Sequence, residues 1–254
     1  MTTLIADAQI EVELPEPSDV ALLPDGRFLV VSDKKPTLAI VGIDGGTSFV
    51  QLEKIGKKKT GLEAVTYDAT SRLIHAFSEE ARSLLRFRWD GDPERDPVYE
   101  GARSLSFGDR KNKGVEGLAH LDASASPTGR SALLLATEGA PRGLFLLDAA
   151  GALADEAAQE ITLDDAVLAA CVDFSGLAFD RRSRRILLVS DESSSLVELT
   201  LEGDGGRLEA RTVACHTLRG STGAPLDRVE GVAVDAAGRW WVLLEDERVL
   251  VRVR

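Results

Sequence analysis

Short apolar runs alternate with turns along the chain, and one such pattern returns five times. Each copy opens with a segment similar to VEGVA, continues through a turn rich in Asp, Gly, Ser and Arg, and then enters an apolar run that closes on an acid. Two apolar runs separated by a turn of this kind predict a β-hairpin. The five opening segments are residues 18–22, 62–66, 115–119, 174–178 and 229–233.

A third apolar run follows in every copy, and in the first four copies a further turn leads to a fourth short strand. Four antiparallel strands per repeat predict an all-β propeller in which each repeat is one blade. The fifth copy ends after three strands, whereas residues 10–14 form a strand with no hairpin partner of its own. We therefore expect a single domain, residues 1–254, forming a five-bladed β-propeller whose last blade is closed by the N-terminal strand.

The expected blades cover residues 19–61, 62–114, 115–173, 174–228, and 229–254 together with 1–18. The alternative is a β-sandwich with a small second domain, but a sandwich gives no reason for a repeat of this period. Two Ala-rich stretches, residues 150–159 and 164–171, are expected to form single helical turns in connections between strands.

The composition narrows the class of partner. Lys and Arg number 30 and Asp and Glu 42, which gives a formal net charge of −12. This charge repels phosphates over a long range, so we expect neither nucleic-acid nor anionic-membrane binding. The N-terminal stretch has no features of a signal peptide and no apolar run reaches 18 residues, so we expect a cytoplasmic monomer. Cys171 and Cys215 lack metal-site or disulfide spacing and are expected to be free thiols.

Acidic residues recur at two positions of the repeat. Strand direction alternates within a blade, so the start of its first strand and the end of its second lie on the same face of the disk. The first series is Asp19, Glu63, Glu116 and Glu230, with Ser175 in the fourth copy, and the second is Asp33, Glu79, Glu138, Asp191 and Glu245. Carboxylates gathered on one face repel one another and require a cation, interleaved basic residues or protonation.

A hard divalent cation would satisfy this face, since Ca²⁺ takes six to eight oxygen ligands with tolerant geometry. The candidate metal ligands are Asp19, Glu63, Glu116, Asp191, Glu230 and Glu245. In the alternative interpretation, the acids accept hydrogen bonds from neighbouring blades and hold the blades together. The repeat alone does not separate the two.

Basic residues precede several of the acids and belong to the same face. The candidate ligand-binding residues are Lys57, Lys58, Lys59, Arg110, Lys111, Lys113 and Arg228. Cations beside a metal would suit a small anionic ligand, and Glu63, Glu116 and Glu230 are the candidate catalytic residues for metal-assisted hydrolysis of a phosphoester, ester or lactone. In the alternative interpretation, these basic residues only neutralise the acids and bind no ligand. The competing function is a non-catalytic platform that binds a protein partner or basic peptide.

The sequence gives weaker evidence for other kinds of catalytic or metal site. His75 and His120 lie inside apolar strands and are expected to be core residues, and His216 has no catalytic partner in the pattern. The chain contains no GxSxG, HExxH or Walker A motif. Residues 90–101 resemble a calcium loop, but Arg95 replaces the required glycine, so residues 90–96 are predicted to be a hairpin turn.

The segments DFSGLAFDRRSRRILLVSDESSSLVELTLEGDG and RVEGVAVDAAGRWWVLLEDERVLVRV resemble the SdiA-regulated family of bacterial propellers. KGVEGLAHLDASASPTGRSALLLATEGAPRGLFLLD is similar to strands of the phytase-like and esterase-like propellers. The resemblance implies a propeller with a calcium site and, in the phytase-like relatives, phosphoester hydrolysis. It assigns the family's acidic positions to Glu116, Ser175, Asp191, Glu230 and Glu245. The chain departs from the six-bladed phytase plan, because it has five repeats.

Overall fold

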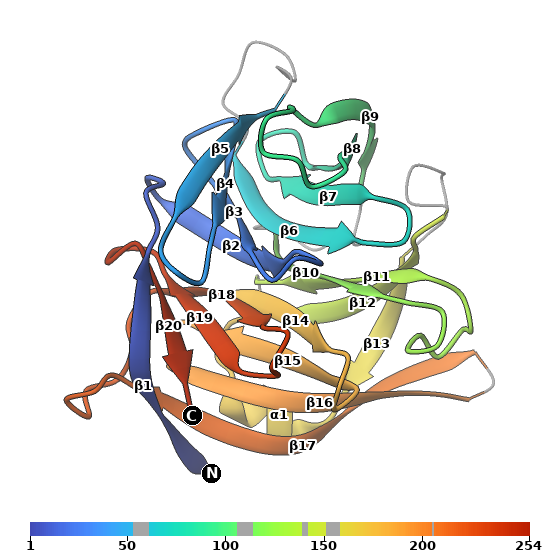
Figure 1. Cartoon of the computed structure of the whole chain (residues 1–254). Coiled ribbons are helices and arrows are strands. Elements are labelled where there is room, and N and C mark those ends of the chain that lie inside the picture. Colours follow the sequence, from blue (N-terminus) through green and yellow to red (C-terminus); the bar gives the residue numbers. More distant parts are fainter. Residues whose placement is uncertain (53–60, 106–113, 139–141, 151–157, 205) are drawn as a thin grey trace.

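The computed structural model describes residues 1–52, 61–105, 114–138, 142–150, 158–204 and 206–254 (Figure 1). Almost all regular structure in these residues is β-strand, and the strands pair into antiparallel arrays of four. The expected all-β, propeller-like fold is confirmed. No helix in the described ranges is long and apolar enough to cross a membrane.

Each array follows the chain from its first strand outward, except that the last array takes its outer strand from the N-terminus. The first array contains β2 (Pro17–Leu22), β3 (Phe28–Ser32), β4 (Thr37–Val41) and β5 (Thr47–Gln51). The second contains β6 (Leu62–Asp68), β7 (Leu73–Ser78), β8 (Ser83–Arg88) and β9 (Val98–Ser104). The third contains β10 (Val115–Leu121), β11 (Ala132–Thr137), β12 (Gly143–Asp148) and β13 (Gln159–Leu163).

The fourth array contains β14 (Gly176–Asp180), β15 (Arg185–Ser190), β16 (Ser195–Asp204) and β17 (Arg207–Arg219). The fifth contains β18 (Val229–Val234), β19 (Trp240–Leu244), β20 (Val249–Val253) and β1 (Thr2–Glu11). The pairing of β1 with β20 confirms that the N-terminal strand completes the last repeat. The strand begins eight residues earlier than residues 10–14 predict, and its first residues, Thr2–Ile5, pair in parallel with the end of β17.

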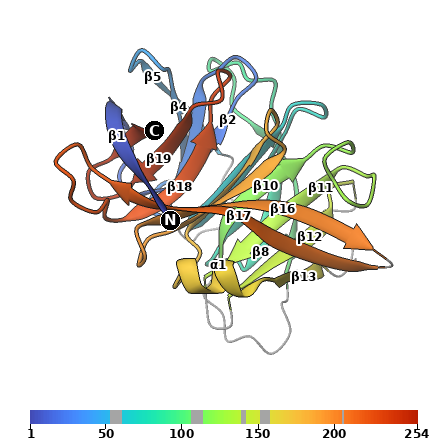
Figure 2. The ribbon, with the colours of Figure 1, turned by 90° about the horizontal axis from the view of Figure 1, so that it is seen from below.

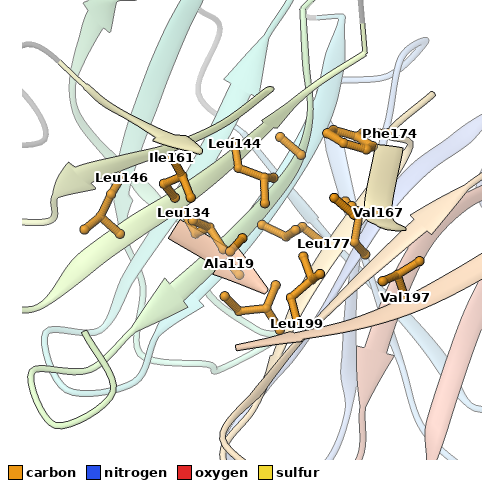
Figure 3. Packing of buried hydrophobic residues seen from close by; sticks show 14 of the residues in the cluster. Ala119, Leu134, Leu144, Leu146, Ile161, Val167, Phe174, Leu177, Val197 and Leu199 are labelled. Atoms are coloured by element: carbon orange, nitrogen blue, oxygen red, sulfur yellow. The ribbon is translucent and has the colours of Figure 1, made fainter. Parts of the chain in front are cut away.

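The five first strands contact one another in a closed ring, in the order β2, β6, β10, β14, β18 and back to β2 (Figure 1). The apolar side chains between each pair of neighbouring arrays form a separate core cluster. Figure 3 shows the cluster between the third and fourth arrays, where Leu134, Leu144 and Ile161 face Leu177 and Leu199. Burial of these core clusters is the main stabilising contribution to the fold, since no array can cover its own apolar face.

The outer edge departs from a set of separate four-stranded units. β16, with 10 residues, and β17, with 13, are longer than the other strands of the first four arrays and project as a long ribbon (Figure 2). Residues Thr162 and Leu163 of β13 pair in parallel with β17 and join the third array to the fourth. The pairing of β1 with β17 adds the fifth array, which gives one sheet of 12 strands. The pairing covers edges that would otherwise expose unpaired N–H and C=O groups.

One of the two predicted helical turns is present as α1 (Asp165–Ala170), which follows β13. Asp164 caps it by accepting the N–H of Val167 at 3.0 Å and also accepts the N–H of Thr212 on β17 at 2.7 Å. Residues 151–157 of the other predicted turn lie outside the described residues. Cys171 and Cys215 are free thiols, as expected.

Candidate functional site

Three glutamates, Glu63, Glu116 and Glu230, occupy the same position in their arrays. Each is left unpaired by a β-bulge at the start of the first strand, because the register passes directly from the preceding residue to the following one. A bulge re-aims the side chain that it leaves unpaired. We call these three residues the inner acids. Ser18 is the residue left out at the corresponding bulge of the first array.

Asp19 does not belong to this series. The strand register aligns it with the next position, which is occupied by Ala64, Gly117, Gly176 and Gly231 in the other arrays. A Cβ atom on Gly231 would lie 2.9 Å from Asp19 Oδ1. The small residues therefore leave room for the single carboxylate of Asp19 within the ring of first strands.

Asp19 has no accessible surface and acts as a bridge between strands. Its Oδ1 accepts the N–H of Val20 and its Oδ2 accepts the N–H of Val65 on β6, both at 2.8 Å. Burial raises the pKa of Asp19 well above its ordinary value, although the N–H groups oppose this shift. Its contacts match the interpretation that the acids hold neighbouring repeats together.

The inner acids lie close enough to the second series to repel it. Burial, followed by the charges of Asp33 and Glu79, raises the pKa of Glu63 to about 7. Burial and then Asp191 and Glu245 raise the pKa of Glu230 to about 8, against the opposing effect of Arg228.

The pKa of Glu116 is also well above its usual range, first because of burial and then because of Glu63 and Glu138. The two acid series therefore meet on one face, as the sequence predicts. We call the inner acids together with Asp33, Glu79, Glu138, Asp191 and Glu245 the acid cluster.

Two basic side chains neutralise parts of the acid cluster. Arg228, predicted as a ligand-binding residue, makes an ion pair with Glu245 and lies 3.9 Å from Glu230 Oε1 and 4.0 Å from Asp191 Oδ2. Its φ of 53° is in the left-handed region, where a non-glycine residue requires support from its contacts. Lys34 pairs with Asp33 at 2.7 Å. The sequence interpretation missed Lys34, although it directly follows Asp33 in the chain.

Asp173 is a second residue that the sequence interpretation missed. It is buried, accepts a hydrogen bond from the Ser190 hydroxyl, and accepts the N–H of Glu192 at 3.1 Å. Nearby, Asp191 accepts the N–H of Val229 at 3.1 Å, which links the fourth array to the fifth. Asp173 precedes the serine of the repeat by two residues, a position that the repeat pattern does not mark.

Within the described residues, no cation lies within ion-pair distance of Glu63 or Glu116. Of the other predicted ligand-binding residues, Lys57, Lys58, Lys59, Arg110, Lys111 and Lys113 lie outside the described residues. In the ranges that the structure covers, no three Asp, Glu, His or Cys side chains are placed to hold one metal ion. The donors have the oxygen chemistry that Ca²⁺ prefers, but at most two of these acids can share one ion in this arrangement.

His75 and His120 take the places expected of core residues. His75 is fully buried, and burial lowers its pKa to about 3. His120 is 6% exposed and its Nε2 lies 2.7 Å from Ser131 Oγ. His216 contacts Thr2 and Glu198 on the outer strands. Residues 90–96 form the predicted turn, in which Arg95 pairs with Asp92 at 2.9 Å.

The SdiA-regulated family model matches residues 61–250. Comparison with curated proteins gives no match. Among solved structures, the glutaminyl cyclase of Myxococcus xanthus is similar with a TM-score of 0.64 and 14% identity, over 100% of this chain and 97% of that chain. The gluconolactonase XC5397 of Xanthomonas campestris gives a TM-score of 0.54 and 12% identity, over 98% and 88%. The PQQ-bound aldose sugar dehydrogenase of Streptomyces coelicolor gives 0.57 and 13%, over 99% and 98%. At these identities the likeness shows the fold alone.

Proposed function

Given that this chain belongs to the SdiA-regulated family, we propose that its acid cluster binds a divalent cation, with Ca²⁺ as the best-suited ion, and supports hydrolysis of a lactone or ester. The observation that carries the proposal is that no cation among the described residues lies within ion-pair distance of Glu63 or Glu116. Burial raises the pKa of both carboxyls, and repulsion adds to the shift, from Asp33 and Glu79 at Glu63 and from Glu63 and Glu138 at Glu116. A bound cation removes this repulsion and stabilises both ionised forms.

The contacts of each carboxylate indicate which of them are available to bind such an ion. Asp19 is excluded as a ligand because its two oxygens already accept backbone N–H groups and it has no accessible surface. Asp191, Glu230 and Glu245 are engaged by Arg228. Of the predicted metal ligands, Glu63 and Glu116 remain, and water would complete the coordination shell of Ca²⁺, which tolerates mixed ligands.

The chemistry follows from the same carboxyls. A bound cation would polarise the carbonyl oxygen of the substrate. Glu230, whose pKa is about 8, is suited to exchange a proton near neutral pH, which is the requirement for a general acid or base. Arg228 would orient an anionic group of the substrate by its guanidinium. One of the similar structures is a gluconolactonase, which supports a lactone as the first substrate class to test.

We further propose that the five arrays are the five blades of a closed propeller. The ring of first strands and the core cluster between each neighbouring pair support this count. In this arrangement the acid cluster surrounds one opening of the central axis. The second, third and fifth arrays each contribute two glutamates to it, and the first and fourth each contribute one aspartate.

Calorimetric titration with CaCl₂ after EDTA treatment tests the site directly. The expected result is saturable binding to the full chain that falls at least about tenfold in Glu116→Gln, because half of the carboxylate pair is lost. Glu247→Gln is the matched control, since this exposed residue lies beside the cluster in sequence and changes the charge equally. Binding that is absent, or equally weak in both variants, contradicts the cation site.

Activity is measured separately, with glucono-δ-lactone, p-nitrophenyl acetate and p-nitrophenyl phosphate as substrates. We expect Ca²⁺-dependent turnover of the lactone or the acetate, and its loss in Glu230→Gln while Ca²⁺ binding persists. Calcium binding without turnover of any of these substrates rejects the hydrolase and retains the cation site.

The acid cluster also supports a second candidate function, the binding of a basic peptide. Arg228 shows that a guanidinium fits among Asp191, Glu230 and Glu245. An arginine of a partner protein would be held in the same way. A fluorescent tetra-arginine peptide that binds the chain and is released by Ca²⁺ would favour this function over hydrolysis.

A further inference from the structure

A cavity of about 420 Å³ lies at the other end of the first strands from the acid cluster. Its lining comes from all five first strands and the turns that follow them, for example Leu22 of β2, Ala69 after β6 and Val234 of β18. The acid cluster lies instead where these strands begin. Asp19, which has no accessible surface, lies one residue before the first lining residue of β2, Val20. Solvent therefore reaches Asp19 from neither end.

The walls of the cavity are largely apolar. Leu22, Phe179 and Val234 supply larger side chains, while Ala69 and Ala236 leave space at the turns. Cavities of 300–1,000 Å³ with apolar walls and a few polar groups are the usual form of small-molecule sites. An aliphatic or aromatic body fits such a wall better than a bare inorganic ion does.

The two acidic residues that line the cavity, Asp180 and Asp235, are buried. Asp180 is buried and accepts the N–H of Arg182 at 2.9 Å and the hydroxyl of Ser183 at 2.6 Å. Asp235 is buried and is paired with Arg239 at 2.6 Å. Both carboxylates are therefore used within their own turns.

The two cationic groups of the lining, Arg181 and Arg182, are exposed. Arg182 donates one hydrogen bond to the carbonyl of Ala237. Arg181 makes no ion pair with any described residue. The exposed charge at the mouth is thus positive, opposite in sign to the acid cluster, and an exposed guanidinium binds carboxylates through two parallel hydrogen bonds.

His120 is a lining residue whose ring carries an unpaired buried polar atom. It lines the cavity, and only 6% of its surface is exposed. Its Nε2 is occupied by Ser131 at 2.7 Å, but its buried Nδ1 has no hydrogen-bond partner among the described residues. A bound oxygen would reach Nδ1 only if the imidazole ring turned, and such a contact would recover the free energy that an unpaired buried polar atom costs.

We propose that this cavity binds a small organic carboxylate whose apolar body contacts Leu22, Phe179 and Val234 and whose carboxylate pairs with Arg181 and Arg182. The site is separate from the acid cluster and does not depend on the proposed hydrolase. A ligand of this cavity needs an apolar body and one anionic group, so octanoate is a suitable probe. Neither 1-octanol, which has the same chain length but lacks the charge, nor inorganic phosphate, which lacks the apolar body, meets both conditions.

Calorimetric titration of the full chain with the three probes tests the proposal. We expect saturable octanoate binding at least about tenfold tighter than that of 1-octanol or phosphate, because a charge-assisted pair contributes this much beyond the shared alkyl chain. Arg181→Gln, which removes no ion pair within the described chain, should weaken octanoate about fivefold or more without changing 1-octanol. Arg130→Gln is the control, since Arg130 is an exposed arginine paired with Asp148 outside the cavity.

Two further measurements locate the ligand. Ala236→Leu fills the open end of the cavity and should weaken octanoate, and the ring resonances of His120 should shift when octanoate is added. Glu116→Gln should leave octanoate binding unchanged, which separates this site from the acid cluster. No saturable binding, or binding that Arg181→Gln and Ala236→Leu both leave unchanged, overturns the proposal. Equal affinity for phosphate overturns it as well.

Discussion

Asp19 Oδ2 accepts the backbone N–H of Val65 at 2.8 Å, so one side chain of β2 is bonded to the first strand of the next array. The other oxygen accepts the N–H of Val20 in its own strand. A carboxylate used in this way stabilises the ring of first strands from within. Its burial has a cost, because the charged form is poorly solvated there and its pKa is raised.

Asp19→Ala is expected to lower the free energy of unfolding by about 2–5 kcal/mol, because it leaves two buried N–H groups without acceptors and opens a cavity. Asp19→Asn keeps the shape and one acceptor oxygen, so it should cost less than Asp19→Ala. Urea denaturation of both variants measures the difference. Calcium affinity should be the same in Asp19→Asn and the wild type, and a large loss of affinity would instead identify Asp19 as a ligand.

The glycines that align with Asp19 lead to a second prediction. In Gly176→Ala, the new Cβ would lie 2.7 Å from Gly231 Cα and 3.0 Å from the carbonyl oxygen of Glu230. Both are backbone atoms that cannot move independently, so we expect a loss of about 1–3 kcal/mol in the free energy of unfolding. The control is Gly46→Ala, where the nearest atom is Asp44 Oδ1 at 3.5 Å. Equal stability of the two variants would show that the first strands have room to separate.

The strands and their grouping could be predicted from the sequence because apolar runs, turns and the five-fold repeat all indicate the same pattern. That Asp19 does not align with Glu63 could not be predicted, because a β-bulge leaves one residue out of the pairing without changing the residues around it. In the first array the bulge residue is Ser18, and Asp19 occupies the position of Gly231. Only the pairing register of the first two strands of each array distinguishes an acid that bridges two strands, such as Asp19, from an inner acid.

The face that carries the acids was also predictable, since strand direction alternates in every repeat. How each acid is neutralised was not predictable, because partners such as Arg228 and Lys34 are not repeated from one array to the next. Arg228 pairs with Glu245 across the β18–β19 hairpin, where the N–H of Glu245 donates to the Arg228 carbonyl at 3.0 Å. The corresponding residue in the second array is Gly61, so the repeat itself does not predict an arginine at this position.

Arg228→Gln tests whether this guanidinium holds part of the acid cluster in its ionised form. The variant removes the cation nearest to Glu230 and Glu245, so it should lower stability most where both are ionised, above the pKa of Glu230, about 8. The side chain of Arg228 is 45% exposed, which limits the expected loss at pH 9 to about 1 kcal/mol. Thermal melts at pH 5 and pH 9 measure it. Arg248→Gln is the control, since Arg248 is exposed and also has a positive φ. A loss that is equal at both pH values would assign Arg228 a packing role instead.

The raised carboxyl pKa values predict how stability depends on pH when divalent cations have been removed. Glu63 has a pKa of about 7 in the folded chain against 4.5 ordinarily, so the folded state binds more protons than the unfolded state between these values. Stability should therefore fall as pH rises from about 4.5 to 7, by roughly 3 kcal/mol at most from this group. Glu230 extends the fall in stability to about pH 8.

Two results should follow from these pKa values. Glu63→Gln should flatten the dependence of stability on pH between about 4.5 and 7. Ca²⁺ should raise the melting temperature far more at pH 8 than at pH 5, because only ionised carboxylates bind it. Melts across pH 5–9, with and without Ca²⁺, check both expectations. A profile that is flat without Ca²⁺ and unchanged by it would show that these carboxyls are already neutralised within the protein.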